Sequence, residues 1–93
     1  MPSQPAPAEY YRAAEQLGRR VRTLREAQHL TQEKLAEMSG LSRNQIQNIE
    51  GNRGNQKGAN GQPTPGNARL DTVFRLANAL GVDVVYLISP DSA

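Results

Sequence analysis

Side chains that can form paired hydrogen bonds are concentrated in residues 43–48, RNQIQN. On a helix that turns about 100° per residue, Ile46 and Ile49 fall on one side. The opposite side carries Asn44, Gln47 and Asn48, flanked by Arg43. Asparagine and glutamine amides can bond adenine N6 and N7, and arginine can bond guanine O6 and N7. This pattern predicts a helix that buries two isoleucines and presents groups able to bind the edges of base pairs.

Groups suited to catalysis or metal binding are not clustered in this sequence. It contains no cysteine, its single histidine is His29, and its carboxylates are scattered. Acid–base catalysis, nucleophilic catalysis and most metal sites need several such groups close together. We therefore expect that the protein is not an enzyme, and that it uses no metal and no cofactor.

The positive charge lies in the middle of the chain. The 93 residues carry a net charge of +2, but residues 12–69 contain ten Lys/Arg and five Glu, which leave a local charge of +5. A basic segment of this kind attracts polyanions such as nucleic acid. An ordinary solvated surface has a similar composition, so charge alone leaves both interpretations open.

Apolar spacing and capping residues predict two helices before residue 41. In residues 9–28, apolar residues recur every three or four positions, which is typical of one helix face. These residues are Tyr10, Ala14, Leu17, Val21 and Leu24. Thr31 has the character of an N-cap for a second helix. We assign the apolar face of that helix to Leu35, Ala36 and Met38. Gly40 ends it, because glycine accepts the positive φ found after helix ends.

Three further helices follow the same rules. Ser42 and Gln45 fit a capping box at the start of a helix that continues to about residue 50. A fourth helix spans residues 70–80 and is closed by Gly81. Its apolar residues are Leu70, Val73, Phe74, Ala77 and Leu80. Asp83 is a candidate N-cap for a short helix over residues 84–88. The sequence therefore predicts an all-α fold with five helices.

The remaining segments lack the apolar residues that a core requires. We expect residues 1–8 to be a disordered tail, residues 9–88 to form one domain, and residues 89–93 to be a C-terminal tail. Residues 51–68 include five Gly, four Asn and two Pro, and we expect them to be a long flexible loop within the domain. The first residues lack the pattern of a signal peptide, and the longest apolar run is too short to cross a bilayer. We expect a cytoplasmic, nucleoid-associated protein with no membrane partner.

The short break between the second and third helices predicts a steep angle between them. Ala36 is small enough to let the third helix approach, and Leu35, Ile46 and Ile49 can fill the angle. This is the geometry of a helix-turn-helix, which places its second helix in the DNA major groove.

Residues 17–50 and 70–88 resemble the lambda-repressor/Cro family of bacterial and phage regulators, also called the xenobiotic response element type. The matching positions are Gln32, Leu35, Ala36, Gly40, Ile46, Ile49 and Glu50. The resemblance continues through LGRRVRTLREAQHLTQ and LDTVFRLANALGV, and it implies a five-helix lambda-repressor-like DNA-binding domain. That family usually joins helices three and four by a short loop that touches the DNA backbone, whereas here the loop is greatly lengthened.

The resemblance also implies roles for individual side chains. It implies base contacts for Arg43, Asn44 and Asn48, and a base or phosphate contact for Gln47. It implies that Gln32 contacts phosphate and supports the first base-contacting side chain. Arg25 and Glu50 match a pair that forms a structural salt bridge. The twofold dimer interface implied for the last helix would use Val84, Val85, Tyr86 and Ile88.

Further candidates for phosphate contact follow from charge and position. They are Arg20, Arg22, Gln45, Arg53 and Lys57. Each also has a structural interpretation: Gln45 can serve as the capping partner of Ser42, and the basic side chains can simply be solvated.

These expectations favour a sequence-specific transcriptional regulator that binds double-stranded DNA. Our hypothesis is a repressor that binds a palindromic operator as a homodimer, with the 43–50 helix in the major groove. A phage or plasmid repressor, a controller protein of a restriction system and an antitoxin all remain open. The alternative is a protein-interaction module of the same fold, either an antitoxin that neutralises a toxin or a bridging coactivator. Such a module should be apolar or acidic at positions 43, 44, 47 and 48, and this chain is neither.

Overall fold

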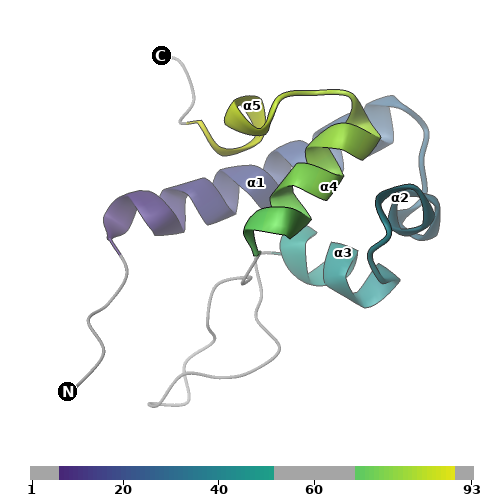
Figure 1. The fold of residues 1–93 in the computed structure, drawn as a ribbon, viewed down its shortest axis with the longest axis horizontal. Coiled ribbons are helices and arrows are strands. Elements are labelled where there is room, and N and C mark those ends of the chain that lie inside the picture. Colours follow the sequence, from purple (N-terminus) through teal and green to yellow (C-terminus); the bar gives the residue numbers. More distant parts are fainter. Residues whose placement is uncertain (1–6, 52–68, 90–93) are drawn as a thin grey trace.

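The computed structural model describes residues 7–51 and 69–89, which form five α-helices (Figure 1). The helices are α1 (Ala8–Ala27), α2 (Gln32–Ser39), α3 (Arg43–Glu50), α4 (Leu70–Leu80) and α5 (Val84–Ile88). No strand occurs within the described residues, so the prediction of an all-α fold with five helices is confirmed. None of the helices in this part of the chain is long and apolar enough to cross a membrane.

The expected boundaries of the domain stay a prediction, but α1 begins one residue before the expected start at residue 9. Ala8, which we assigned to the N-terminal tail, is the first residue of α1, because this helix begins directly after Pro7. The rest of that tail (1–6), nearly all of the expected loop (52–68) and the last residues of the C-terminal tail (90–93) lie outside the described residues.

Local capping chemistry sets most of the helix ends as predicted. The Thr31 hydroxyl accepts a hydrogen bond from the Lys34 backbone N–H at 3.0 Å, which caps α2. Gly40 and Gly81 end α2 and α4 in the left-handed region, with φ of 76° and 75°. Asp83 lies at the N-cap position of α5, but its exposed side chain makes no capping hydrogen bond, so the predicted side-chain cap is wrong.

Each of the five helices contributes one fully buried aliphatic side chain to a common core. These side chains are Val21, Leu35, Ile46, Leu76 and Leu87. In Figure 1, α1 runs across the molecule between α5 and α3, and it packs on α3, α4 and α5. Because α2 and α3 have eight residues each, they are too short to be stable alone, and the shared core must hold them.

Four apolar residues that we placed on the apolar faces of helices are exposed. The exposed fractions are 36% for Tyr10, 45% for Met38, 73% for Leu70 and 57% for Phe74, so these assignments are wrong. In α2, Ser39 takes the inward position, and its hydroxyl donates to the Leu35 carbonyl at 2.8 Å. In α4, the buried face is rotated away from Leu70 and Phe74. It consists of Thr72, Val73, Leu76, Ala77 and Leu80.

Gly18 marks the closest approach between α1 and α3. A Cβ atom at this position would lie 2.2 Å from the Ile49 backbone carbonyl oxygen. This distance is far below van der Waals contact, and the neighbour is backbone that no rotamer change can move. The absence of a side chain at Gly18 therefore lets α3 pack directly on α1.

Replacing Gly18 by alanine should destabilise the protein, although alanine normally strengthens a helix by about 1 kcal/mol relative to glycine. We expect the free energy of unfolding to fall by about 1–3 kcal/mol, because α3 must move away from α1. Urea denaturation measures this change. Thr23→Ala, at an exposed position of the same helix, should stay within about 0.5 kcal/mol. A Gly18→Ala protein as stable as the original would contradict the close packing.

Candidate nucleic-acid interface

The turn between α2 and α3 is fixed by three local devices. Gly40 takes the left-handed conformation. The Leu41 backbone N–H then donates to the Ala36 carbonyl at 3.0 Å, which closes the end of α2. The Ser42 backbone N–H donates to Gln45 Oε1 at 2.8 Å, and the Gln45 backbone N–H donates to Ser42 Oγ at 3.1 Å. This is the predicted capping box, and it starts α3 immediately after the turn.

The two faces of α3 differ as the spacing predicted. Ile46 and Ile49 are buried against the rest of the domain. Arg43, Asn44 and Gln45 are exposed, whereas Gln47 and Asn48 are half-buried. The base-contact candidates therefore lie on the side of the helix that is not packed on the core. No carboxylate of α3 shares this face, because the Glu50 side chain is only 5% exposed.

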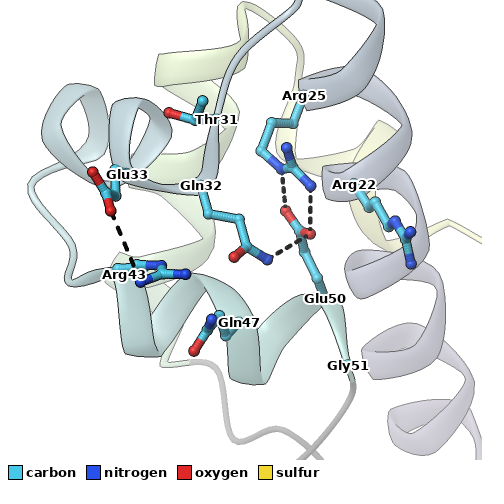
Figure 2. A pocket seen from close by; sticks show the side chains of 9 residues that line it. All are labelled: Arg22, Arg25, Thr31, Gln32, Glu33, Arg43, Gln47, Glu50 and Gly51. Carbon is cyan, nitrogen blue, oxygen red and sulfur yellow. Dashed lines mark hydrogen bonds and ion pairs between the residues drawn. The ribbon is translucent and has the colours of Figure 1, made fainter.

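Glu50 accepts hydrogen bonds from two other helices (Figure 2). Arg25 of α1 donates from Nε to Glu50 Oε2 at 2.7 Å and from Nη2 to Oε1 at 3.0 Å. Gln32 of α2 donates from Nε2 to Glu50 Oε1 at 3.2 Å. Arg25 also donates from Nη1 to the Leu30 carbonyl at 2.8 Å. This cluster, which we call the Arg25–Glu50–Gln32 clamp, ties α1, α2 and α3 together.

The clamp contains the salt bridge predicted for Arg25 and Glu50. The Arg25 side chain is 13% exposed, so both charges are largely removed from water. The hydrogen bond to Glu50 raises the pKa of Arg25, while burial opposes this effect. A bidentate arginine–carboxylate pair is strong and directional, which suits it to fixing the position of a helix.

An open groove of about 800 Å³ lies between the start of α2, one side of α3 and the side of α1. The clamp forms part of its lining, together with Arg22, Glu33, Arg43 and Gln47 (Figure 2). Arg43 Nη1 lies 3.8 Å from Glu33 Oε1 at the surface. The groove therefore places predicted base and phosphate contacts next to one another, although they come from three helices.

Residues 18–90 match a family model described as a helix-turn-helix domain, which covers most of the chain. The chain belongs to the helix-turn-helix family. No curated protein matches it. The match confirms the helix-turn-helix that the sequence predicted, within the lambda-repressor-like fold of five helices.

Two solved structures resemble the helix-turn-helix protein over most of its length. One is the restriction-modification controller protein C.AhdI from Aeromonas hydrophila, with 32% identity over 80% of this chain and 94% of that chain, and a TM-score of 0.60. The other is the hypothetical transcription factor NHTF from Neisseria, with 27% identity over 97% of this chain and 87% of that chain, and a TM-score of 0.67. Family and structures together identify a DNA-binding transcriptional regulator.

The remaining phosphate candidates of the helix-turn-helix protein separate into three groups. Arg22 lines the groove, so it lies on the same side of α1 as α3. Its Nε lies 3.4 Å from Glu26 Oε2. Arg20 instead turns to α5, where it donates to the Tyr86 carbonyl and its guanidinium carbon lies 5.1 Å from the centre of the Tyr86 ring. The structure does not bring Arg20 to the groove. Arg53 and Lys57 lie outside the described residues.

The predicted dimer residues of α5 are mostly at the surface. Val85, Tyr86 and Ile88 are exposed, and Val84 is half-buried. Leu87 is the residue that anchors α5 in the core. The helix-turn-helix domain thus carries an exposed apolar strip on the helix for which dimerisation was predicted.

Glu33 is a charged residue of the groove that the sequence did not identify as a candidate for the interface. Its place in the first turn of α2 already has a structural explanation, because the helix dipole favours an anion there. A signal was present, because Glu33 and Arg43 stand in the first turns of the two helices that the short turn brings together.

Replacing Arg25 by methionine should destabilise the helix-turn-helix protein by about 3–5 kcal/mol, because the buried Glu50 carboxylate loses its cation. Urea denaturation gives the free energy of unfolding. Arg22→Met, which removes a pair that is more than half exposed on the same helix, should cost less than about 1 kcal/mol.

A double variant separates the charge from the packing. Arg25→Met with Glu50→Met should be more stable than Arg25→Met alone, because no unpaired charge remains. If Arg25→Met cost no more than Arg22→Met, the clamp would not hold the three helices.

Proposed function

We propose that this protein is a repressor that binds a palindromic operator as a homodimer, with α3 in the major groove. The observation that carries the proposal is the outer face of α3. This face presents arginine and amide groups, and the opposite side of the helix is held by the rest of the domain. The clamp and the two buried isoleucines hold the helix backbone in place. A rigid helix with bidentate groups on its outer face is what base discrimination requires.

In this proposal, base contacts come from Arg43, Asn44, Gln47 and Asn48. Arg43 and Asn44 are exposed at the N-terminal end of α3, which is the end that enters the groove first in helix-turn-helix complexes. Their bidentate groups suit guanine and adenine respectively.

Phosphate contacts come from groups around this face, namely Gln32, Gln45 and Arg22. The side-chain carbonyl oxygen of Gln45 accepts the capping hydrogen bond, and the amide N–H groups of the same side chain can donate to a phosphate near the start of α3. Arg22 lines the groove. Arg20 is not part of this proposal because its guanidinium contacts Tyr86. Arg53 and Lys57 stay predictions.

Dimerisation would use the apolar strip of α5, formed by Val85, Tyr86 and Ile88 with Val84 beside them. Contiguous exposed apolar residues commonly mark an interface between protein chains. A twofold dimer through α5 would present two α3 helices about 34 Å apart, which matches successive major grooves on one side of DNA. The likeness to a restriction-modification controller protein favours a controller among the possible kinds of regulator.

Selection of binding sites from a random DNA pool tests the proposal directly. The purified protein should enrich a palindrome with half-sites about one helical turn apart. Sedimentation of the protein with the selected DNA should show two chains per duplex. Enrichment of a single half-site would contradict the dimer. No enrichment, at low salt where general binding occurs, would contradict sequence-specific recognition.

Replacing Asn44 by alanine should weaken binding to the selected site by about 1–3 kcal/mol and relax the preference at one base pair. Arg22→Ala should instead weaken binding to every duplex similarly and reduce the slope of log K against log salt by about one. Asn78→Ala, at an exposed position of α4, is the matched control and should change neither quantity. Titrations of selected and scrambled duplexes at several salt concentrations measure both effects. Unchanged base preference in Asn44→Ala would show that the base-contacting face is misplaced.

A second candidate function, protein binding, is supported by an exposed patch at the start of α4. Leu70 and Phe74 project there beside Arg69, Asp71 and Arg75, around an open hollow of about 830 Å³. Apolar residues rimmed by charges are typical of a protein-binding surface. This function becomes the better one if the site selection enriches no DNA sequence.

A further inference from the structure

The first base-contact candidate is paired with a carboxylate in the structure. Arg43 is the first residue of α3, and Glu33 lies in the first turn of α2. Their side chains meet at 3.8 Å across the mouth of the groove, where they are 58% and 75% exposed (Figure 2). Deeper in the same groove, Glu50 is occupied by Arg25 and Gln32. Glu33 is therefore a negative charge placed at the outer edge of the surface that should face DNA.

We propose that Glu33 is a positioning residue that determines specificity by competing with DNA for Arg43. The inference rests on the proposed function, in which α3 binds the major groove. In the free protein and on non-specific DNA, Glu33 holds the Arg43 guanidinium. On the correct site, Arg43 leaves Glu33 and bonds guanine.

The competition discriminates because the three partners of Arg43 differ in geometry. An exposed ion pair at this distance is weak and easily broken. A phosphate in solvent offers an attraction of a similar kind, and it must also approach the Glu33 carboxylate, which repels it. Guanine offers two acceptors, O6 and N7, spaced for the two donors of a guanidinium, and it carries no net charge. Glu33 therefore penalises phosphate contact more than guanine contact.

This arrangement would act mainly on unwanted complexes. Specificity is the difference between the affinities for the correct and the wrong partner. A repulsive group that weakens the wrong complex therefore increases specificity, just as an attractive group in the correct complex does. Basic DNA-binding proteins bind all DNA through phosphates, so an acidic residue beside the base-contacting arginine limits that background.

The test compares Glu33→Gln with Glu37→Gln. Both glutamates are on α2, and both side chains are 75% exposed, but Glu37 pairs with Lys34 at 3.6 Å instead of with Arg43. Dissociation constants are measured for the selected duplex and for a scrambled duplex at one salt concentration. Glu33→Gln should bind the scrambled duplex about three- to fivefold more tightly and the selected duplex less than about twofold more tightly. Glu37→Gln should shift both duplexes by the same small factor.

A second background shows whether the effect passes through Arg43. In an Arg43→Gln protein, adding Glu33→Gln should change binding no more than adding Glu37→Gln does. The reason is that the Arg43 guanidinium, for which Glu33 and DNA compete, is absent. Thermal unfolding checks that all variants are folded, and an exposed glutamate to glutamine change should leave stability nearly unchanged.

Three results would overturn the inference. If Glu33→Gln and Glu37→Gln had equal effects on both duplexes, the loss of one negative charge from α2 would explain them. The ion pair between Glu33 and Arg43 would then have no role in specificity. If Glu33→Gln weakened the selected duplex and changed the preferred base, Glu33 would contact a base itself, as a carboxylate can with cytosine N4. If the unaltered protein did not distinguish the two duplexes, the proposed function would fail and this inference would fail with it. This last result can be told apart from the first two because it is measured on the unaltered protein, before any variant is compared.

Discussion

The bidentate ion pair between Arg25 and Glu50 is the interaction on which the arrangement of the first three helices depends. It joins the last turn of α1 to the end of α3, and Gln32 extends it to the start of α2. Hydrophobic packing is non-directional, so buried isoleucines alone would allow α3 to slide or rotate by small amounts. Paired hydrogen bonds between planar groups have a fixed geometry, and they hold the end of α3 at one position.

The clamp works together with a contact that depends on the absence of a side chain. At Gly18 the backbone of α3 approaches α1 more closely than any Cβ would allow. This close approach brings Glu50 within reach of Arg25 seven residues further along α1. Burying two charges is costly, and the cost is offset only because each charge meets its partner with good geometry. The glycine and the ion pair therefore support each other.

The same arrangement separates structural charges from charges available for recognition. Glu50 and Arg25 neutralise each other inside the groove, where an unpaired carboxylate would repel DNA. Arg43 and Glu33 meet at the exposed mouth, where an ion pair is weak enough to exchange partners. Arg20, although adjacent in sequence to other arginines of α1, turns to the opposite side and attaches α5 through Tyr86. Burial and partner thus decide which basic side chains face the groove, and charge alone does not.

The sequence by itself determined the five helices, the N-caps of α2 and α3, the turn at Gly40 and the two faces of α3. These features arise from local rules, namely helical spacing, capping hydrogen bonds within three residues and the freedom of glycine at positive φ. The ion pair of Arg25 and Glu50 was also accessible from sequence, but only through resemblance to a family. Tertiary structure alone decided that Gly18 is a point of contact and that Leu70 and Phe74 face outward. The physical reason is that each of these depends on how a helix is rotated against others distant in the sequence, and such rotation is set by the packing of the whole core.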